Sequence, residues 1–193
     1  MSARLQRGRG DSDRDHLVAG LSGRVVEVGC GHGAMFTRYP ASVTQLDAIE
    51  PEPTLRAQAQ DAAASVTVSV AVHAGDAEHL PLEDASADAV VFSLVLCSVP
   101  DQIAALTEAR RVLKPGGQLR FYEHVVASGG PGAALQRLLD RTGIWPKFGG
   151  GCHVARDTGA AIRAAGFELT ECERFTHPRP GIPHILGVAV PRA

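Results

Sequence analysis

The chain has 193 residues, of which 45% are hydrophobic and 21% charged, and its formal net charge is −2. This composition is typical of a globular domain with a core of its own, and the small negative charge argues against a nucleic-acid partner. The longest apolar run, at about residues 89–99, is too short to cross a bilayer. No secretory signal follows the N-terminal arginines, so we expect a cytoplasmic location. The small negative charge favours a small molecule rather than a nucleic acid as the partner.

Residues 1–13 are rich in Arg, Gly, Asp and Ser and are expected to be disordered, which leaves 14–193 as one domain. The cysteines at positions 30, 97, 152 and 172 include no CxxC pair, so neither a disulfide framework nor a zinc motif is indicated. Only folding could bring Cys152 and His153 together with further ligands. No metal site is therefore predicted.

Apolar and β-branched runs alternate with helical patterns along the chain. A short helix is expected over 14–21, then helices over 34–39, 51–64 and 101–113, one ending near 141, and one from 157 or 158 to 166. Strands are expected near 24–28, 43–49, 66–73, 87–92, 118–125, 167–174 and 182–190. This alternation predicts an α/β fold, Rossmann-like and doubly wound, with a mostly parallel sheet.

Capping and breaking residues set several of these helix boundaries. Pro51 suits the first turn of a helix, where its missing N–H is not needed. Asp101 can cap a helix that turns Ile103, Leu106 and Leu113 inward. The sequence Lys-Pro-Gly-Gly at 114–117 predicts a stop and a turn.

Residues 127–156 interrupt the alternation. The segment holds two glycine-rich runs with Trp145 and Phe148 between them. Long segments of this kind in a compact domain are often functional, so we interpret 127–156 as a lid rather than a plain surface loop.

Three glycines at alternate positions, Gly29, Gly31 and Gly33, follow the valine-rich strand 25–28. Glycines let the backbone turn sharply and approach a ligand closely, and a helix N-terminus after them would present free N–H groups. This pattern predicts a nucleotide-type cofactor site. The spacing of Gly29, Gly31 and Ala34 also fits a dinucleotide fingerprint, and Glu50 could hold ribose hydroxyls in either case.

Three further features disfavour a dinucleotide. Glu27 stands where a dinucleotide site usually has an apolar residue, and it could face the ammonium of an amino-acid moiety. Asp76, between Gly75 and Ala77, follows the third strand, where its carboxylate can accept a hydrogen bond from an adenine amino group. A Pro-Gly-Gly turn precedes the fifth strand.

With these motifs in order from Gly23 to Val125, the chain resembles the class I S-adenosylmethionine-dependent methyltransferases. The resemblance implies seven strands with the last, 182–190, antiparallel, and S-adenosylhomocysteine as the product. By this resemblance, the methionine part of the cofactor lies against Gly29, Cys30 and Gly31, within the loop that Glu27 and Gly33 flank. The ribose lies against Glu50 and Pro51, and the adenine against Asp76 and Ala77. Ser93 and Leu94 lie beside the sulfonium.

A closer resemblance, to the alkyl-thiol methyltransferases of the methyltransferase-like 7 group, rests on the segments 94–99, 123–125 and 183–189. It implies a small, apolar thiol acceptor, which Leu94, Trp145 and Phe148 would enclose, with Cys97 lining the pocket. Amine, oxygen and carbon acceptors of a metabolite, lipid or quinone precursor stay open, and an NAD-dependent oxidoreductase is a more distant alternative. Histidine titrates near neutral pH, so His124, His153 and His184 are the candidate bases.

Overall fold

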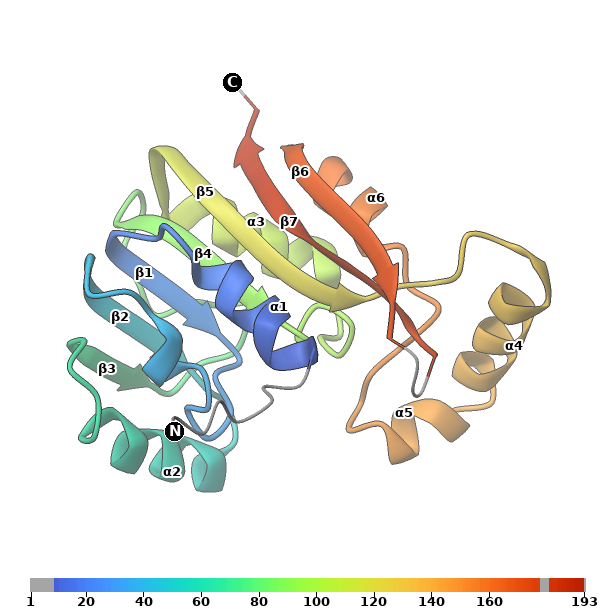
Figure 1. The fold of residues 1–193 in the computed structure, drawn as a ribbon, viewed down its shortest axis with the longest axis horizontal. Coiled ribbons are helices and arrows are strands. Elements are labelled where there is room, and N and C mark those ends of the chain that lie inside the picture. The colour runs from blue at the N-terminus through green and yellow to red at the C-terminus, as the bar shows by residue number, and fades with distance from the viewer. Residues whose placement is uncertain (1–8, 178–180, 193) are drawn as a thin grey trace, which may run out of the picture.

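The computed structural model describes residues 9–177 and 181–192 (Figure 1). Within them, seven strands form one sheet in the order β3-β2-β1-β4-β5-β7-β6. The strands are β1 (Gly23–Val28), β2 (Val43–Ile49), β3 (Val70–His73), β4 (Ala87–Ser93), β5 (Leu113–His124), β6 (Phe167–Thr176) and β7 (Pro183–Pro191). Strands β1 to β5 pair in parallel, and β7 is antiparallel to both β5 and β6. The predicted fold class and the antiparallel last strand are confirmed.

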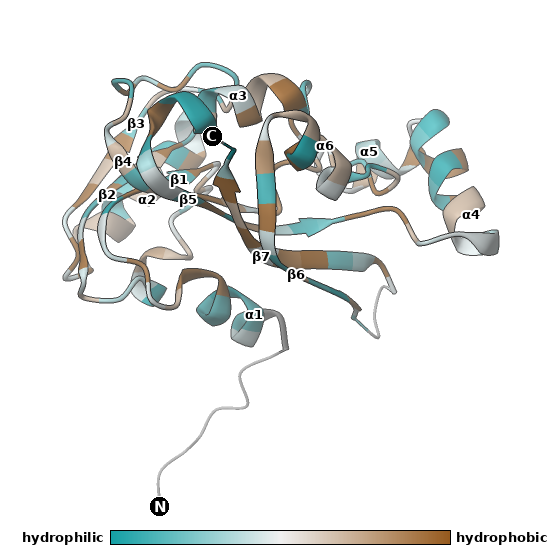
Figure 2. Cartoon of the chain, turned by 90° about the horizontal axis from the view of Figure 1, so that it is seen from above, coloured by the Kyte–Doolittle hydropathy of each residue, from teal (hydrophilic) through white to brown (hydrophobic). Residues whose placement is uncertain are grey.

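Helices cover both faces of this sheet. The helices are α1 (Arg9–Val18), α2 (Pro53–Ala63), α3 (Gln102–Val112), α4 (Gly130–Arg141), α5 (Ile144–Phe148) and α6 (Thr158–Ala164), with a 3-10 turn η1 (Phe36–Arg38). Figures 1 and 2 show α1 on one face and α3 with α6 on the other, whereas α4 and α5 lie beyond one end of the sheet. Successive strand residues point to opposite faces of the sheet and so pack against different helices. Val25 packs with Leu17 of α1, and Val26 packs on the side of Leu106 of α3.

Helix α1 begins earlier than its sequence indicates. Residues 1–8 of the segment expected to be disordered lie outside the described residues, but residues 9–13 are helical. Arg38 binds the carboxylates of Asp11 at 2.6 Å and Asp15 at 2.7 Å, and so ties the first turns of α1 to η1. A partner 27 residues away cannot be read from local composition.

Two predicted helices and the orientation of one side chain differ from the structure. Pro51 precedes α2, which starts at Pro53 because the Glu52 carboxylate caps it by accepting from the N–H groups of Thr54 and Leu55. Asp101 caps α3 as predicted, but Ile103 is 42% exposed and does not face inward. The helix expected over 34–39 is only the short turn η1.

Two strand boundaries also differ. Strand β3 starts at Val70 rather than near residue 66. Strand β5 already includes the Lys-Pro-Gly-Gly turn: Leu113 pairs with Ala87, and the ladder resumes where Ala89 pairs with Gln118. The residues between form a bulge, in which Gly116 has φ +81°.

Strand β7 passes through the narrowest place in the sheet. A Cβ on Gly187 would overlap the backbone oxygen of Glu171 in β6 and lie 2.9 Å from the ring of Phe121 in β5. Only glycine allows β7 to lie between these two neighbours. In the described part of the chain, no helix has the length and apolar character needed to span a membrane.

Candidate cofactor and acceptor site

A cavity of about 570 Å³ opens at the carboxyl ends of the parallel strands β1 to β4, where open α/β sheets bind their ligands. Loops after each of these strands and one glycine of the predicted lid line it. The lining residues are Val28, Gly29, Gly31, Ile49, Glu50, Pro51, Leu55, Gly75, Asp76, Ala77, Glu78, Leu94, Val95, Ser98, Val99, Pro100 and Gly150.

The glycine loop after β1 forms one wall by its backbone. Gly29 has φ +69°, and a Cβ there would lie 2.6 Å from the side chain of Val95. Gly31 has φ +57° and no heavy atom within 4 Å of where its Cβ would be, so a ligand can approach the chain closely. Gly33 packs instead against Phe36 and does not line the cavity. Gly33 therefore contributes to the shape of the loop and not to the surface of the cavity.

Glu50 joins this loop to the end of β2. Its Oε2 accepts from the Gly31 N–H at 2.8 Å, and its Oε1 accepts from the Glu52 N–H at 3.0 Å. The side chain is 5% exposed and lines the cavity together with Pro51. Each carboxylate oxygen can accept more than one hydrogen bond, so Glu50 can also bind hydroxyl groups of a ligand.

Asp76 and Ala77 line the cavity beyond β3, as the sequence predicts. The Asp76 side chain is 58% exposed, and its Oδ1 accepts from the Glu78 N–H at 2.8 Å. This hydrogen bond holds the carboxylate at the rim while its second oxygen stays available to a ligand.

Glu27 is buried on the face of the sheet that α1 covers. Its side chain is 2% exposed, and Oε2 has no hydrogen-bond partner among the described residues. Burial raises the pKa of Glu27 to about 8, which the hydroxyl of Tyr39 opposes. An unsatisfied buried carboxylate favours a cationic partner.

Four predicted cofactor residues do not line the cavity: Glu27, Cys30, Gly33 and Ser93. Cys30 is buried, and burial and the nearby Glu27 raise the pKa of its thiol to about 12. The Ser93 hydroxyl is buried without a hydrogen-bond partner. These side chains lie behind the backbone that forms the wall, and spacing alone cannot distinguish the two positions.

Sequence reasoning missed most of the wall that follows β4. Val95, Ser98, Val99 and Pro100 belong to the run that the sequence presents as one apolar strand end. The chain instead leaves the strand at Leu94, whose φ of +60° is unusual for a residue other than glycine. The pair Val99-Pro100 was the available signal, because the residue before proline is biased toward extended backbone.

The turn after β4 is held by a buried carboxylate. Glu123 in β5 is 0% exposed and accepts from the N–H groups of Val95 and Leu96 at 2.9 Å and of Cys97 at 3.1 Å. Burial raises the pKa of Glu123 well above its usual value, and these three N–H groups oppose the rise. Arg156 donates to the carbonyls of the same turn, so two charged groups fix its shape.

Of the three predicted histidines, the structure brings two together. The rings of His124 and His184 have centroids 4.5 Å apart. His184 is 4% exposed, and burial followed by the neighbouring histidines lowers its pKa to about 4. His153 lies elsewhere, with Nδ1 3.8 Å from a carboxylate oxygen of Asp140. None of the three lines the cavity.

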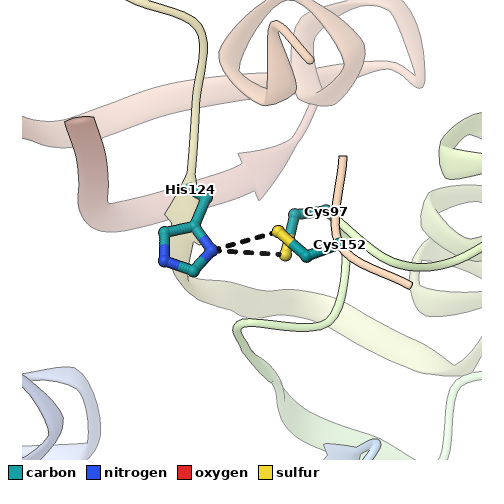
Figure 3. Close-up of side chains that lie close together, drawn as sticks. All are labelled: Cys97, His124 and Cys152. Carbon is teal, nitrogen blue, oxygen red and sulfur yellow. Dashed lines mark hydrogen bonds between the residues drawn. The ribbon is translucent and has the colours of Figure 1, made fainter. Parts of the chain in front are cut away.

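Two cysteine thiols converge on His124 (Figure 3). Its Nδ1 lies 3.2 Å from Cys152 Sγ and 3.8 Å from Cys97 Sγ. Cys97 is 1% exposed and Cys152 6% exposed. A hydrogen bond with Cys152, followed by burial, raises the pKa of Cys97 to about 12, and the same bond lowers the pKa of Cys152.

The segment 127–156 forms α4, α5 and a glycine-rich return. Gln136 of α4 donates to the carbonyls of Val125 and Val154 and so fixes this helix to the body of the protein. Trp145 is half-buried against Cys152, whereas Phe148 is 82% exposed and does not enclose the cavity in this structure. Gly150 alone brings the segment to the cavity wall.

Comparisons with known proteins agree with this geometry. The family described as "Methyltransferase domain" matches residues 26–121. Thiol S-methyltransferase TMT1B of Rattus norvegicus is 37% identical over 175 residues, which cover 86% of this chain and 70% of that protein. Thiol S-methyltransferase TMT1A of Homo sapiens is 36% identical, over 89% of this chain and 73% of its own.

Among solved structures, an S-adenosylmethionine-dependent methyltransferase from Mesorhizobium loti superposes with a TM-score of 0.69 at 16% identity. The match covers 95% of this chain and 99% of that one, which shows the fold. S-adenosylmethionine rather than NAD is therefore the cofactor of the glycine loop. The chain belongs to the class I S-adenosylmethionine-dependent methyltransferases, in the group that contains the thiol S-methyltransferases.

Proposed function

We propose that this enzyme transfers the methyl group of S-adenosylmethionine to the sulfur of a small, fairly apolar thiol. The observation that carries the proposal is the apolar wall after β4, where Leu94, Val95, Val99 and Pro100 continue the cavity from the glycine loop. This wall suits an apolar acceptor beside the cofactor. The relatives named as thiol S-methyltransferases support sulfur as the accepting atom.

The residues present fit the cofactor. The open space before Gly31 suits close contact with the methionine part. Glu50 is placed to accept from the ribose hydroxyls, and Asp76 with Ala77 to contact adenine. When bound, the cofactor supplies an electrophilic methyl group on a sulfonium. Ser93 lies behind this wall, so Leu94 and Val95 are the better candidates beside the sulfonium.

The protein's main contribution to the reaction is alignment. Holding the acceptor in line with the methyl–sulfur bond can supply about 7–11 kcal/mol of the barrier. The turn fixed by Glu123 provides a rigid wall for this purpose. Of the candidate bases, His124 stands beside the segments that carry Ser98 and Gly150 of the wall, whereas His184 is kept neutral by burial and His153 faces Asp140. We infer that His124 is the one of the three histidines that serves the acceptor side of the site.

We infer further that 127–156 acts as a lid over this acceptor side. Gly150 already contributes to the cavity wall, and the exposed Phe148 is the side chain that would change its surroundings most on closing. The net charge of −2 supports a small-molecule acceptor rather than a nucleic acid.

The first test is a substrate panel. The protein is incubated with S-adenosylmethionine and with thiols, amines, phenols and quinols of matched size, and S-adenosylhomocysteine and the methylated product are measured by mass spectrometry. We expect turnover with apolar thiols and a thioether product. Turnover confined to amines, phenols or quinols would replace the thiol by a nitrogen, oxygen or carbon acceptor.

A further inference from the structure

The structure gathers two thiols and one imidazole from three separate segments. Cys97 lies in the turn after β4, His124 ends β5, and Cys152 lies between α5 and α6. Their sulfur and Nδ1 atoms all lie within 4.8 Å of one another. They point toward one common point in Figure 3. We propose that Cys97, His124 and Cys152 bind a Zn²⁺ ion whose fourth position takes the sulfur of the acceptor thiol.

The distances suit such an ion. Zinc binds thiolate sulfur at about 2.3 Å and imidazole nitrogen at about 2.1 Å, so a tetrahedral site separates sulfur from nitrogen by about 3.6 Å. The two measured separations, 3.2 Å to Cys152 and 3.8 Å to Cys97, lie on either side of this value. Thiolate and imidazole are also the ligand types that select zinc over magnesium or calcium.

The charge and surroundings suit it as well. Two thiolates would neutralise the dication, so the complex could occupy this buried position without a net charge. The indole N–H of Trp145 is buried, and the residue packs against the cluster that contains both cysteines. A zinc-bound thiolate accepts hydrogen bonds from such donors.

The site has an open position. Among the described residues, no fourth Cys, His, Asp or Glu joins the three. The nearby Glu123 already accepts from three backbone N–H groups, and His153 faces Asp140. Zinc sites with three protein ligands typically keep the fourth position for a reacting molecule, whereas structural sites have four.

That position lies beside the cavity. Cys97 Sγ is 3.7 Å from the hydroxyl of Ser98, which lines the cavity, and Gly150 lines it two residues before Cys152. An acceptor that enters along the apolar wall can therefore reach the ion with its sulfur. The ligand roles of Cys97 and His124 explain why these side chains lie behind the wall rather than in it.

The chemistry balances as follows, and this part rests on the proposed function. The thiol sulfur binds zinc and its proton leaves to water, because a coordinated thiol is deprotonated. A sulfur lone pair then forms the new bond to the methyl carbon, and the electrons of the old carbon–sulfur bond stay on the departing neutral thioether of the cofactor. The methylated sulfur is uncharged and leaves zinc to a water molecule. In this arrangement His124 holds the metal and is not the base.

The metal test uses the reduced full-length chain. Zinc content is measured by atomic emission, and the chelator-treated protein is titrated with Co²⁺, which gives thiolate-to-cobalt charge-transfer and tetrahedral d–d absorption. The variants are Cys97→Ser, Cys152→Ser and His124→Gln. The matched controls are Cys172→Ser, an exposed cysteine in β6, and His153→Gln, next to Cys152 in the chain. Binding of S-adenosylhomocysteine, followed by thermal shift, shows that each variant is folded.

We expect one zinc per chain, lost in the three cluster variants and kept in both controls. A reduced, folded parent that binds neither Zn²⁺ nor Co²⁺ with at least micromolar affinity would overturn the proposal. The same holds if the purified protein contains a Cys97–Cys152 disulfide and still binds no metal after reduction.

The fourth position is tested by adding an apolar thiol to the cobalt-loaded protein while S-adenosylhomocysteine formation is measured in parallel. A stronger charge-transfer band and turnover support both proposals. Turnover with an unchanged spectrum would remove the thiol from the metal. A changed spectrum without turnover would keep the metal site and contradict the proposed function instead.

Discussion

The cofactor end of the cavity and its acceptor end are built in different ways. At the cofactor end, short loops after β1, β2 and β3 present backbone and a few carboxylates, each within a few residues of its glycine or strand end. At the acceptor end, the turn after β4 depends on Glu123 in β5 and on Arg156 at the end of the predicted lid. The first end is encoded locally, and the second by contacts between distant segments.

This difference predicts how substitutions at each end should affect ligand affinity and stability. A change at the cofactor end should alter ligand affinity while the fold persists. A change at the acceptor end should remove a partner on which several other groups depend, and so reduce stability and activity together. Four substitutions test the contrast.

The largest effect is expected for Glu123→Ala. Three buried N–H groups lose their acceptor, and each unsatisfied group costs about 1–3 kcal/mol, so the free energy of unfolding should fall by roughly 3 kcal/mol or more. Denaturant unfolding measures this fall. Glu173→Ala, at an exposed position in β6, is the control. A loss below about 1 kcal/mol would show that the turn stands without Glu123.

The next effect is expected for Gly29→Val. A β-branched residue at φ +69° is strained, and its Cβ displaces Val95 from the cavity wall. Because Val95 lines the cavity, its displacement should cost about 1–3 kcal/mol of binding free energy, which is a roughly fivefold to 160-fold loss of S-adenosylhomocysteine affinity by calorimetry. Gly116→Val carries the same kind of strain at φ +81° away from the cavity, and it should destabilise the protein without changing affinity. Equal affinity losses in both variants would refute the local explanation.

Glu27→Gln should separate stability from binding. Burial raises the pKa of Glu27 to about 8 in the folded state, so its contribution to stability is complete below about pH 4.5 and is lost as the pH rises through 8. Glutamine does not ionise. The melting temperature of the variant relative to the parent should therefore increase from pH 5 to pH 8, while the affinity for S-adenosylhomocysteine stays unchanged because Glu27 does not line the cavity. A difference that stays constant with pH would mean that Glu27 has the same pKa in the folded and the unfolded protein, and would contradict this prediction.

The smallest effect on stability is expected for Phe148→Ala. The side chain is 82% exposed, so the free energy of unfolding should change by less than about 0.5 kcal/mol. If the lid closes over the acceptor, the KM for apolar thiols should rise severalfold while S-adenosylhomocysteine affinity stays constant. Leu135→Ala, 56% exposed on α4, is the control. An unchanged KM would contradict the lid interpretation.

The same contrast explains what the sequence could predict. Strand alternation and the glycine loop are local signals: they predicted the sheet correctly, and Glu50 and Asp76, which they singled out, line the cavity. Whether a side chain beside the loop faces the cavity depends on the packing behind the loop, so the sequence could not show that the side chains of Glu27 and Cys30 are buried away from the cavity.

The acceptor side carried no comparable signal. Cys97 and Cys152 stand 27 and 28 residues from His124, on either side of it. The parallel pairing of β4 with β5 brings Cys97 beside His124, and the His153 N–H, which donates to the Cys97 carbonyl at 2.7 Å, holds the Cys152 segment there. The start of α1 shows the same limit, since it depends on Arg38.

The position of β7 has a consequence for how the protein is made. Of the seven strands it is the last in the chain, yet it lies between β5 and β6 and passes them at Gly187 with no room for a side chain. While a ribosome is still synthesising this segment, β5 and β6 cannot pair with each other in their final places, and each keeps an open edge. The sheet can close only after Pro183–Pro191 has emerged. Until then the nascent chain presents two unpaired edges that invite aggregation, which makes this interval the one at which a chaperone would matter most.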